Sequence, residues 1–308
     1  MTPKRVLVSG ASGLIGFALT RSLAREGWEV LRLVRREPRD AWERSWDPAR
    51  GTIARDALAD VTAVVHLAGA SIGDRPWSPT RKELILRSRV EGTRLLSETI
   101  AALANPPRVF LSASGIHYYG NRGDDVLDDT NEPAAGQGFL ASVCRAWESA
   151  TSAPEARGVR VVRLRTGLVL AREGGALREL LPLFRLGLGG PLGSGRQWWC
   201  WITLGDYTGV VSAVLGDERL AGALHVVAPA PVRNRTFVES LARVLRRPAF
   251  MPAPAFALRL VLGREKADEL LLSSTRAVPT RLLDAGFRFE DPDLPTALAR
   301  MFAPAGLF

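Results

Sequence analysis

Residues 5–36 read RVLVSGASGLIGFALTRSLAREGWEVLRLVRR, and the fold class can be inferred from this segment. The apolar run 6–8 is too short for a helix and predicts a buried strand. Three glycines then follow at spacings of three, and they are Gly10, Gly13 and Gly16. An apolar helical pattern comes next, and the run 30–34 predicts a second parallel strand. Strand, glycine turn, helix and strand in this order make one βαβ unit.

Each glycine of this turn has a physical role. A tight turn after a strand needs a residue that tolerates positive φ, and a pyrophosphate approaches backbone closely only where no Cβ intervenes. The helix that follows presents unpaired N–H groups and a partial positive charge to the phosphates. The pattern therefore predicts a dinucleotide-binding loop. The alternative is an ordinary glycine turn.

The end of the second predicted strand indicates which dinucleotide binds. An acid there would bind a ribose 2′-hydroxyl, whereas an arginine accommodates a 2′-phosphate. The strand ends in Arg35 and Arg36, and no acid occurs until Glu37. A guanidinium matches phosphate geometry, so we predict NADP(H) as the cofactor. The alternative is that the two arginines only form a solvated strand edge.

Composition places the chain among globular proteins. It has 308 residues, of which 46% are hydrophobic and 24% charged, and we expect a cytoplasmic protein with no membrane partner. The two cysteines, at positions 144 and 200, show neither a disulfide framework nor metal-ligand spacing, so we predict buried, inert thiols and no metal.

The net charge of +9 raises the question of nucleic-acid binding. Lysines occur only at positions 4, 82 and 266, so arginine accounts for nearly all of the 41 basic residues. These arginines are spread along the whole chain without a block of five like charges. We therefore do not expect a nucleic-acid partner.

Strands and helices alternate through the first half of the chain. After Arg36 we expect a polar connection, then strands over 63–67, 109–111 and 159–164. Two helices are expected between them: one opens with a Thr80–Glu83 capping box and one spans about 138–155. This alternation predicts an α/β protein with a doubly wound parallel sheet of the Rossmann type.

The pattern loosens after residue 166. We predict a Rossmann domain over residues 1–165, with its sheet completed by parts of 200–230, and a small mixed substrate-side and C-terminal lobe over 166–308. Within this lobe Trp198, Trp199 and Trp201 lie among glycines. We favour a substrate-cleft wall for these tryptophans, and core packing is the alternative.

Several motifs together resemble one family. They are the glycine triplet, His66-Leu67-Ala68-Gly69, Leu111-Ser112-Ala113-Ser114, Tyr119-Gly120, Trp46-Asp47, Ser88-Arg89 and the run from Phe184 to Gly195. The chain resembles the atypical extended short-chain dehydrogenase/reductases, an epimerase-like family often labelled NAD-dependent epimerase/dehydratase or cell-division inhibitor. The resemblance covers essentially the whole chain and includes a C-terminal extension.

The glycine turn, the arginine pair and the resemblance together define the predicted cofactor site. Its residues are Gly10, Ser12, Gly13, Leu14, Ile15, Gly16, Arg35, Arg36, Leu67, Ala68, Gly69, Arg89 and Leu168. The resemblance also implies that the tryptophan-rich stretch lines the substrate cleft.

The chemistry departs from the superfamily pattern. Short-chain dehydrogenases use a Tyr-x-x-x-Lys pair, in which the cation makes the tyrosine a general acid/base at neutral pH. This chain has tyrosines only at positions 118, 119 and 207, and none has lysine four residues later. Phe139 and Val143 stand where the pair is expected. The remaining catalytic candidates are Ser114, at a strand end, and Tyr119, with His117 as a weaker one. The alternative for Tyr119 is an aromatic side chain that covers the nicotinamide pocket, and for His117 we favour a hydrogen-bonded loop residue.

Two functions therefore remain open. The first is an NADP(H)-binding epimerase-like oxidoreductase acting on a small molecule, either a nucleotide-sugar or a carbonyl compound. The second is an NADP(H)-binding sensor or regulatory protein with reduced catalysis. The sequence leaves the oligomeric state open.

Overall fold

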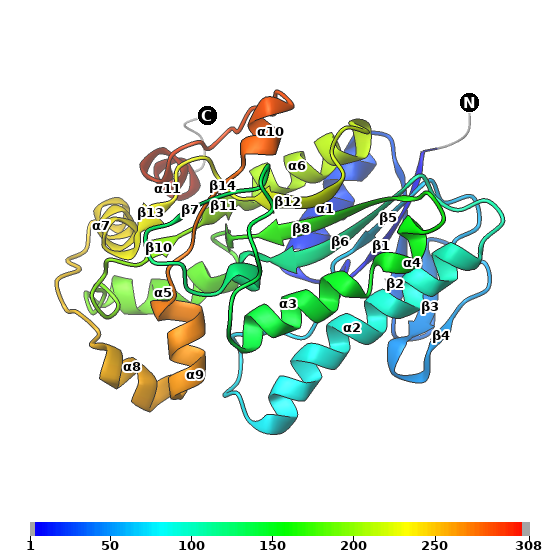
Figure 1. Ribbon diagram of the computed structural model, residues 1–308. Helices are drawn as coiled ribbons and strands as arrows, with labels where there is room; N and C mark the ends of the chain where they lie inside the picture. The colour runs from blue at the N-terminus through cyan, green and yellow to red at the C-terminus, as the bar shows by residue number, and fades with distance from the viewer. Residues whose placement is uncertain (1–3, 304–308) are drawn as a thin grey trace. The chain divides into compact units, whose positions relative to one another are not determined.

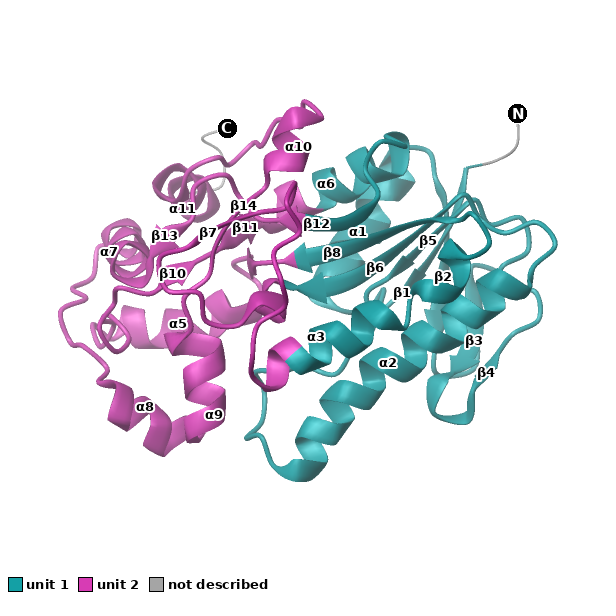
Figure 2. Cartoon of the chain, in the orientation of Figure 1, with its two compact units in different colours: residues 1–115, 142–165, 208–224 teal, residues 116–141, 166–207, 225–308 magenta. Residues whose placement is uncertain are grey.

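The computed structural model describes residues 4–303, which form two compact units (Figures 1 and 2). Unit 1 contains residues 4–115, 142–165 and 208–224. Unit 2 contains residues 116–141, 166–207 and 225–303. The division between residues 165 and 166 that we expect from the sequence stays a prediction.

Unit 1 is built on an eight-stranded sheet with the order β12-β8-β6-β5-β1-β2-β3-β4. Its strands are β1 (Arg5–Ser9), β2 (Glu29–Val34), β3 (Glu43–Asp47), β4 (Thr52–Ile53), β5 (Ala63–His66), β6 (Val109–Gly115), β8 (Arg160–Thr166) and β12 (Gly222–Val226). Strand β1 pairs in parallel with β2 on one side and with β5 on the other. The doubly wound parallel sheet predicted from the sequence is confirmed.

The strand order reverses between β1 and β5. In an open parallel sheet such a switch point leaves a crevice outside the carboxyl ends of the two strands, where ligands bind. The helices of this part of the chain are α1 (Leu14–Arg25), α2 (Pro79–Ala102), α3 (Phe139–Ser149), α4 (Ser152–Glu155) and α6 (Leu204–Gly216). Figure 1 shows α2 and α3 in front of the sheet and α1 and α6 behind it. The hydroxyl of Ser212 donates to Glu26 at 2.9 Å, which ties α6 to the end of α1.

Two local expectations are wrong. The segment expected as a polar connection contains β3, in which Trp46 is buried and pairs with Ile53 of β4. Helix α2 begins at Pro79 with Ser78 as its N-cap, whose hydroxyl accepts the N–H of Arg81 at 3.2 Å. A serine cap followed by proline at the first helical position satisfies the helix start, so the capping box expected at Thr80 is not used.

Unit 2 combines short strands with several helices. Its strands are β7 (Val126–Asp128), β9 (Leu168–Leu170), β10 (Trp198–Trp199), β11 (Trp201–Thr203), β13 (Val232–Arg233) and β14 (Arg276–Val278). Its helices are α5 (Gly175–Arg185), α7 (Asn234–Leu245), α8 (Ala255–Leu262), α9 (Arg264–Ala267), α10 (Thr280–Asp284) and α11 (Leu294–Phe302), with a 3₁₀ turn at Ile116–Tyr119 and a π turn at Asp268–Leu272. Helices α5, α7 and α11 pack their apolar faces around one buried cluster, which includes Leu181, Leu241 and Leu298.

Three further properties follow from the described residues. No helix in residues 4–303 is long and apolar enough to cross a bilayer. Within the same range, no group of three His, Cys, Asp or Glu side chains is arranged to hold a metal ion. Cys144 and Cys200 are free and buried, and burial raises the pKa of the Cys144 thiol to about 11 and that of Cys200 to about 12. Thiols so placed stay protonated and unreactive at neutral pH.

Candidate functional site

Two glycines of the turn after β1, Gly10 and Gly16, leave no room for a side chain. Gly10 has a φ of +71°, and a Cβ there would lie 2.8 Å from the carbonyl carbon of Leu67. A Cβ on Gly16 would lie 2.1 Å from the carbonyl oxygen of Gly10. Backbone atoms of the turn therefore pack directly against the start of α1 and against the chain after β5. This is the close approach that a pyrophosphate-binding loop requires.

The N-terminus of α1 is open to a ligand. Its N-cap is Gly13, no side chain caps it, and its first turn carries no acid. The first N–H groups of a helix have no partner within the helix, and the helix dipole favours an anion at this end. Ser12 and Gly13 are exposed, and Leu14 and Ile15 are partly buried. The turn thus fits the phosphates of a dinucleotide.

A buried serine–histidine pair holds the chain after β5 against β1. The Oγ of Ser9 accepts the N–H groups of Leu67 at 3.1 Å and Ala68 at 3.3 Å, and it lies 2.6 Å from Nδ1 of His66. Because Ser9 accepts twice, we assign its own proton to the bond with Nδ1. His66 then carries its proton on Nε2, which is buried and has no hydrogen-bond partner within residues 4–303. Burial is the main cause that lowers the pKa of His66 to about 3, and the charge of Arg89 adds to it.

The low pKa of His66 predicts an acid-sensitive contribution to stability. Between pH 6.5 and about 3 the unfolded chain binds a proton at this position and the folded chain does not, so the free energy of unfolding falls as the pH decreases. The expected loss from this group is about 2 kcal/mol at pH 5 relative to pH 7. Urea unfolding of wild type and His66→Asn at both pH values measures it, and equal pH dependence in the two proteins would contradict it.

The two arginines after β2 have different surroundings. Arg36 makes a bidentate ion pair with Glu43 of β3, with both N–O distances 2.7 Å. The Arg36 bond, helped by the backbone N–H of Arg39, lowers the pKa of Glu43 to about 2. Arg35 is exposed, and its guanidinium makes no hydrogen bond or ion pair with any residue in the described part of the chain. Of the predicted pair, only Arg35 has its donors available.

Arg89 of α2 supplies a second cation at the end of β5. Its Nη1 donates to the carbonyl oxygens of Ala70 at 2.9 Å and Ile85 at 3.1 Å, and its guanidinium lies 5.0 Å from the ring centroid of Trp147. A Cβ on Gly69 would lie 3.3 Å from the Arg89 guanidinium carbon. Burial lowers the pKa of Arg89 to about 10, and its hydrogen bonds within residues 4–303 go to backbone carbonyls rather than to a carboxylate. A partly buried, uncompensated cation favours an anionic ligand.

Ser114 is joined to a buried ion pair that the sequence did not reveal. Its hydroxyl donates to Oε1 of Glu148 at 2.7 Å, and Glu148 forms an ion pair with Arg165 at 2.8 Å. All three residues are buried. In the sequence, Arg165 is the residue that indicates such a pair, because an arginine inside an otherwise apolar central strand needs a carboxylate partner.

Tyr119 belongs to unit 2 and is fully buried. Its hydroxyl lies 2.6 Å from Nε2 of His225, and Nδ1 of His225 lies 2.9 Å from the carbonyl oxygen of Val278. Since a carbonyl oxygen only accepts, Nδ1 of His225 is the donor in its bond to Val278. Nε2 is then unprotonated and accepts a hydrogen bond from the Tyr119 hydroxyl. The backbone N–H of His225 donates to the Asp129 carboxylate at 2.9 Å. This arrangement favours a structural role for Tyr119.

The three tryptophans, also in unit 2, have three different surroundings. Trp201 is fully buried in the core of the unit, so core packing describes this residue. Trp199 is partly buried against Phe237, with ring centroids 5.2 Å apart. The Trp198 ring lies 4.1 Å from the guanidinium of Arg233 and 4.4 Å from that of Arg276. Leu168, the last predicted cofactor residue, pairs with Trp201 across strands β9 and β11.

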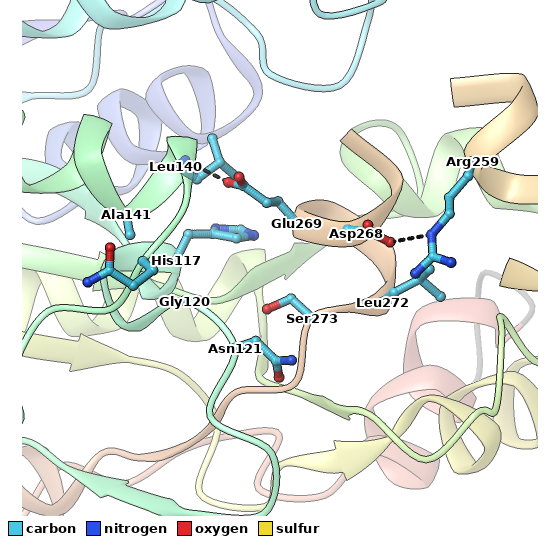
Figure 3. Close-up of a pocket in the computed structure, with 11 residues that line it drawn as sticks. His117, Gly120, Asn121, Leu140, Ala141, Arg259, Asp268, Glu269, Leu272 and Ser273 are labelled. Atoms are coloured by element: carbon cyan, nitrogen blue, oxygen red, sulfur yellow. Dashed lines mark hydrogen bonds and ion pairs between the residues drawn. The ribbon is translucent and has the colours of Figure 1, made fainter. Parts of the chain in front are cut away.

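Unit 2 also contains a cavity of about 340 Å³ (Figure 3). Its lining includes His117, Asn121, Gln137 and Glu269. None of the three tryptophans lines this cavity. Glu269 was missed from the sequence because nothing local connects it to residues more than a hundred positions earlier.

Comparisons with known proteins agree with this geometry. Residues 6–226 match the NAD dependent epimerase/dehydratase family, and residues 253–301 match a domain of unknown function, DUF1731. An epimerase family protein of Mycobacterium leprae, ML0860, is 41% identical over 96% of this chain and 94% of its own. The human epimerase family protein SDR39U1 is 36% identical over 97% of this chain and 100% of its own.

A solved structure gives the same result. The crystal structure of human SDR39U1 (isoform 2) with NADPH superimposes with a TM-score of 0.87, at 34% identity, and covers 97% of this chain and 99% of the human one. The fold, the glycine turn and the family match over residues 6–226 lead to one conclusion. The chain belongs to the NAD dependent epimerase/dehydratase family.

Proposed function

We propose that the chain binds NADP(H) on unit 1 and acts as an epimerase-like oxidoreductase on a small molecule. The observation that carries the cofactor assignment is Arg35, a guanidinium with available donors at the end of β2, in the same unit as the uncapped start of α1. The human relative crystallised with NADPH supports the same cofactor. In this assignment Arg35 binds the 2′-phosphate, and Arg36 stays with Glu43.

The substitution Arg35→Ala tests this assignment. We expect NADPH affinity to fall about 10- to 100-fold, because a charge-assisted contact to phosphate is lost, while NADH affinity stays unchanged. The matched control is Arg50→Ala, which removes an exposed arginine of the same unit and leaves both affinities unchanged. Fluorescence titration with both nucleotides measures this. An equal loss for NADPH and NADH, or no loss, would contradict the assignment.

The nicotinamide, when bound, supplies hydride transfer. The chain must then move a proton, and we propose that Ser114 and Glu148 do so. The Ser114 hydroxyl donates to Glu148 and also contacts the Cys144 thiol, so its oxygen keeps one lone pair that can accept a proton from a substrate hydroxyl. As Ser114 takes that proton, its own passes to Glu148, and the reverse path returns it. Arg165 holds the carboxylate in position with two bonds, at 2.9 and 2.8 Å.

The second candidate function is an NADP(H) sensor, and the absence of a Tyr-x-x-x-Lys pair favours it. A screen of NADPH oxidation over carbonyl compounds and nucleotide-sugars separates the two functions. Turnover that Ser114→Ala abolishes supports the oxidoreductase. Tight NADPH binding without turnover on any substrate supports the sensor.

A further inference from the structure

The cavity in unit 2 contains a carboxylate that is fixed in place. Oε1 of Glu269 accepts the N–H of Phe139 and Oε2 accepts that of Leu140, both at 2.7 Å. Gly138 permits this approach: its φ is +108°, and a Cβ there would lie 2.9 Å from Oε1. Each carboxylate oxygen has two lone pairs, so each keeps the capacity for one further bond. Glu269 therefore offers fixed acceptors to a ligand in the cavity.

The same contacts exclude an anion. The first N–H groups of a helix of this length are an anion-binding site, and at α3 the Glu269 carboxylate already occupies two of them. The cation that lines the cavity, Arg259, is paired with Asp268 at 2.8 Å. The Glu269 charge is thus not balanced by another group of the lining. A diphosphate would meet a net negative cavity in which Glu269 already occupies the first two N–H groups of α3.

The remaining lining suits an uncharged polar molecule. Oδ1 of Asn121 accepts the N–H groups of Ser274 at 3.1 Å and Gly123 at 3.3 Å, so its amide nitrogen is left to donate. Leu140 and Leu272 add apolar surface. Figure 3 shows His117, Asn121 and Glu269 around the same space. The volume of about 340 Å³ is at the small end of the range for small-molecule sites.

We propose that this cavity binds a small uncharged molecule with several hydroxyl groups, held by Glu269 and Asn121, and that it rejects nucleoside diphosphates. Hydroxyls both donate and accept, so they match a carboxylate and an amide N–H together. The proposal goes beyond the proposed function, because it assigns a second ligand site that lies within unit 2. It limits the ligand of this cavity to a polyol or hydroxycarbonyl compound without phosphate.

Saturation-transfer NMR on the full chain tests this, with D-glucose and myo-inositol as neutral probes and UDP-glucose as the phosphate-bearing one. We expect a signal from a neutral probe and none from the uridine protons. The experiment is run with and without saturating NADPH, and NADPH affinity is measured separately. A loss of NADPH binding and a loss of probe binding in this cavity can therefore be distinguished.

Two variants and a matched control locate the signal. Glu269→Gln is expected to weaken the neutral probe about tenfold, since a bond to a charged acceptor is lost. Gln137→Trp, at an exposed lining residue, is expected to fill the cavity and remove the signal without disturbing the fold. Glu265→Gln, an exposed acid one turn earlier, changes the same charge outside the lining and leaves the signal unchanged. Binding of UDP-glucose, silence from both neutral probes, or a signal that survives Gln137→Trp overturns the proposal.

Discussion

The substitution Gly16→Ala is expected to weaken NADPH binding at least about 100-fold and to lower the free energy of unfolding by about 1–3 kcal/mol. The added Cβ would lie 2.1 Å from the carbonyl oxygen of Gly10 and 2.8 Å from Cα of Ala11. Both are backbone atoms, so no flexible side chain can yield. Helix α1 must therefore move away from the turn, which displaces the N–H groups that we assign to the phosphates.

The sign of this effect is informative. Alanine is ordinarily more stable than glycine inside a helix by about 1 kcal/mol. If Gly16→Ala lowers the free energy of unfolding, the cause is therefore the steric clash of the added Cβ and not helix propensity. The matched control is Gly205→Ala in the first turn of α6, where an added Cβ meets nothing within 4 Å. This control should keep its NADPH affinity and unfold at an equal or higher urea concentration. Wild-type affinity and stability in Gly16→Ala would refute the close packing of the turn.

The glycine turn also shows what could be predicted from the sequence. Two of its glycines act through local constraints: Gly10 through positive φ and Gly16 through contact with a residue six positions earlier. Constraints between residues so close in sequence determine which residue types occur and at what spacing. The βαβ unit and the sheet class could therefore be predicted from the sequence. The NADP(H) assignment rests on the same short-range pattern, at the end of β2.

The features that were missed depend on contacts between distant residues. Strand β3 looked polar because Glu43 carries a charge, and only the ion pair with Arg36 makes it compatible with a sheet position. Tyr119 is bonded to a histidine 106 positions away, and Glu269 reaches the start of α3 across 130 positions. No periodicity or spacing reports such pairs. Polar residues of a candidate site are therefore identified by type from the sequence, but their partners are not.

The substitution Arg165→Met is expected to destabilise the chain by about 3–5 kcal/mol, because it leaves the buried Glu148 carboxylate without its cation. Arg165 is only 2% exposed, so water does not replace the lost partner. The matched control is Arg219→Met, which breaks the ion pair with Asp217 at a side chain that is 72% exposed. That change should cost less than about 1 kcal/mol. Urea unfolding measures the free energy of unfolding of both variants. Similar decreases in the two variants would contradict the argument that burial of the ion pair makes its loss costly.

A double variant separates stability from the proton path that we propose. Replacing both charges, in Glu148→Leu with Arg165→Met, should recover much of the lost stability, because no buried charge is then unpaired. The Ser114 hydroxyl nevertheless loses its acceptor. If Ser114 passes a proton to Glu148, the double variant folds, binds NADPH and turns over no substrate. If it retains turnover, the ion pair serves only the fold, and the proton must leave the site by another group.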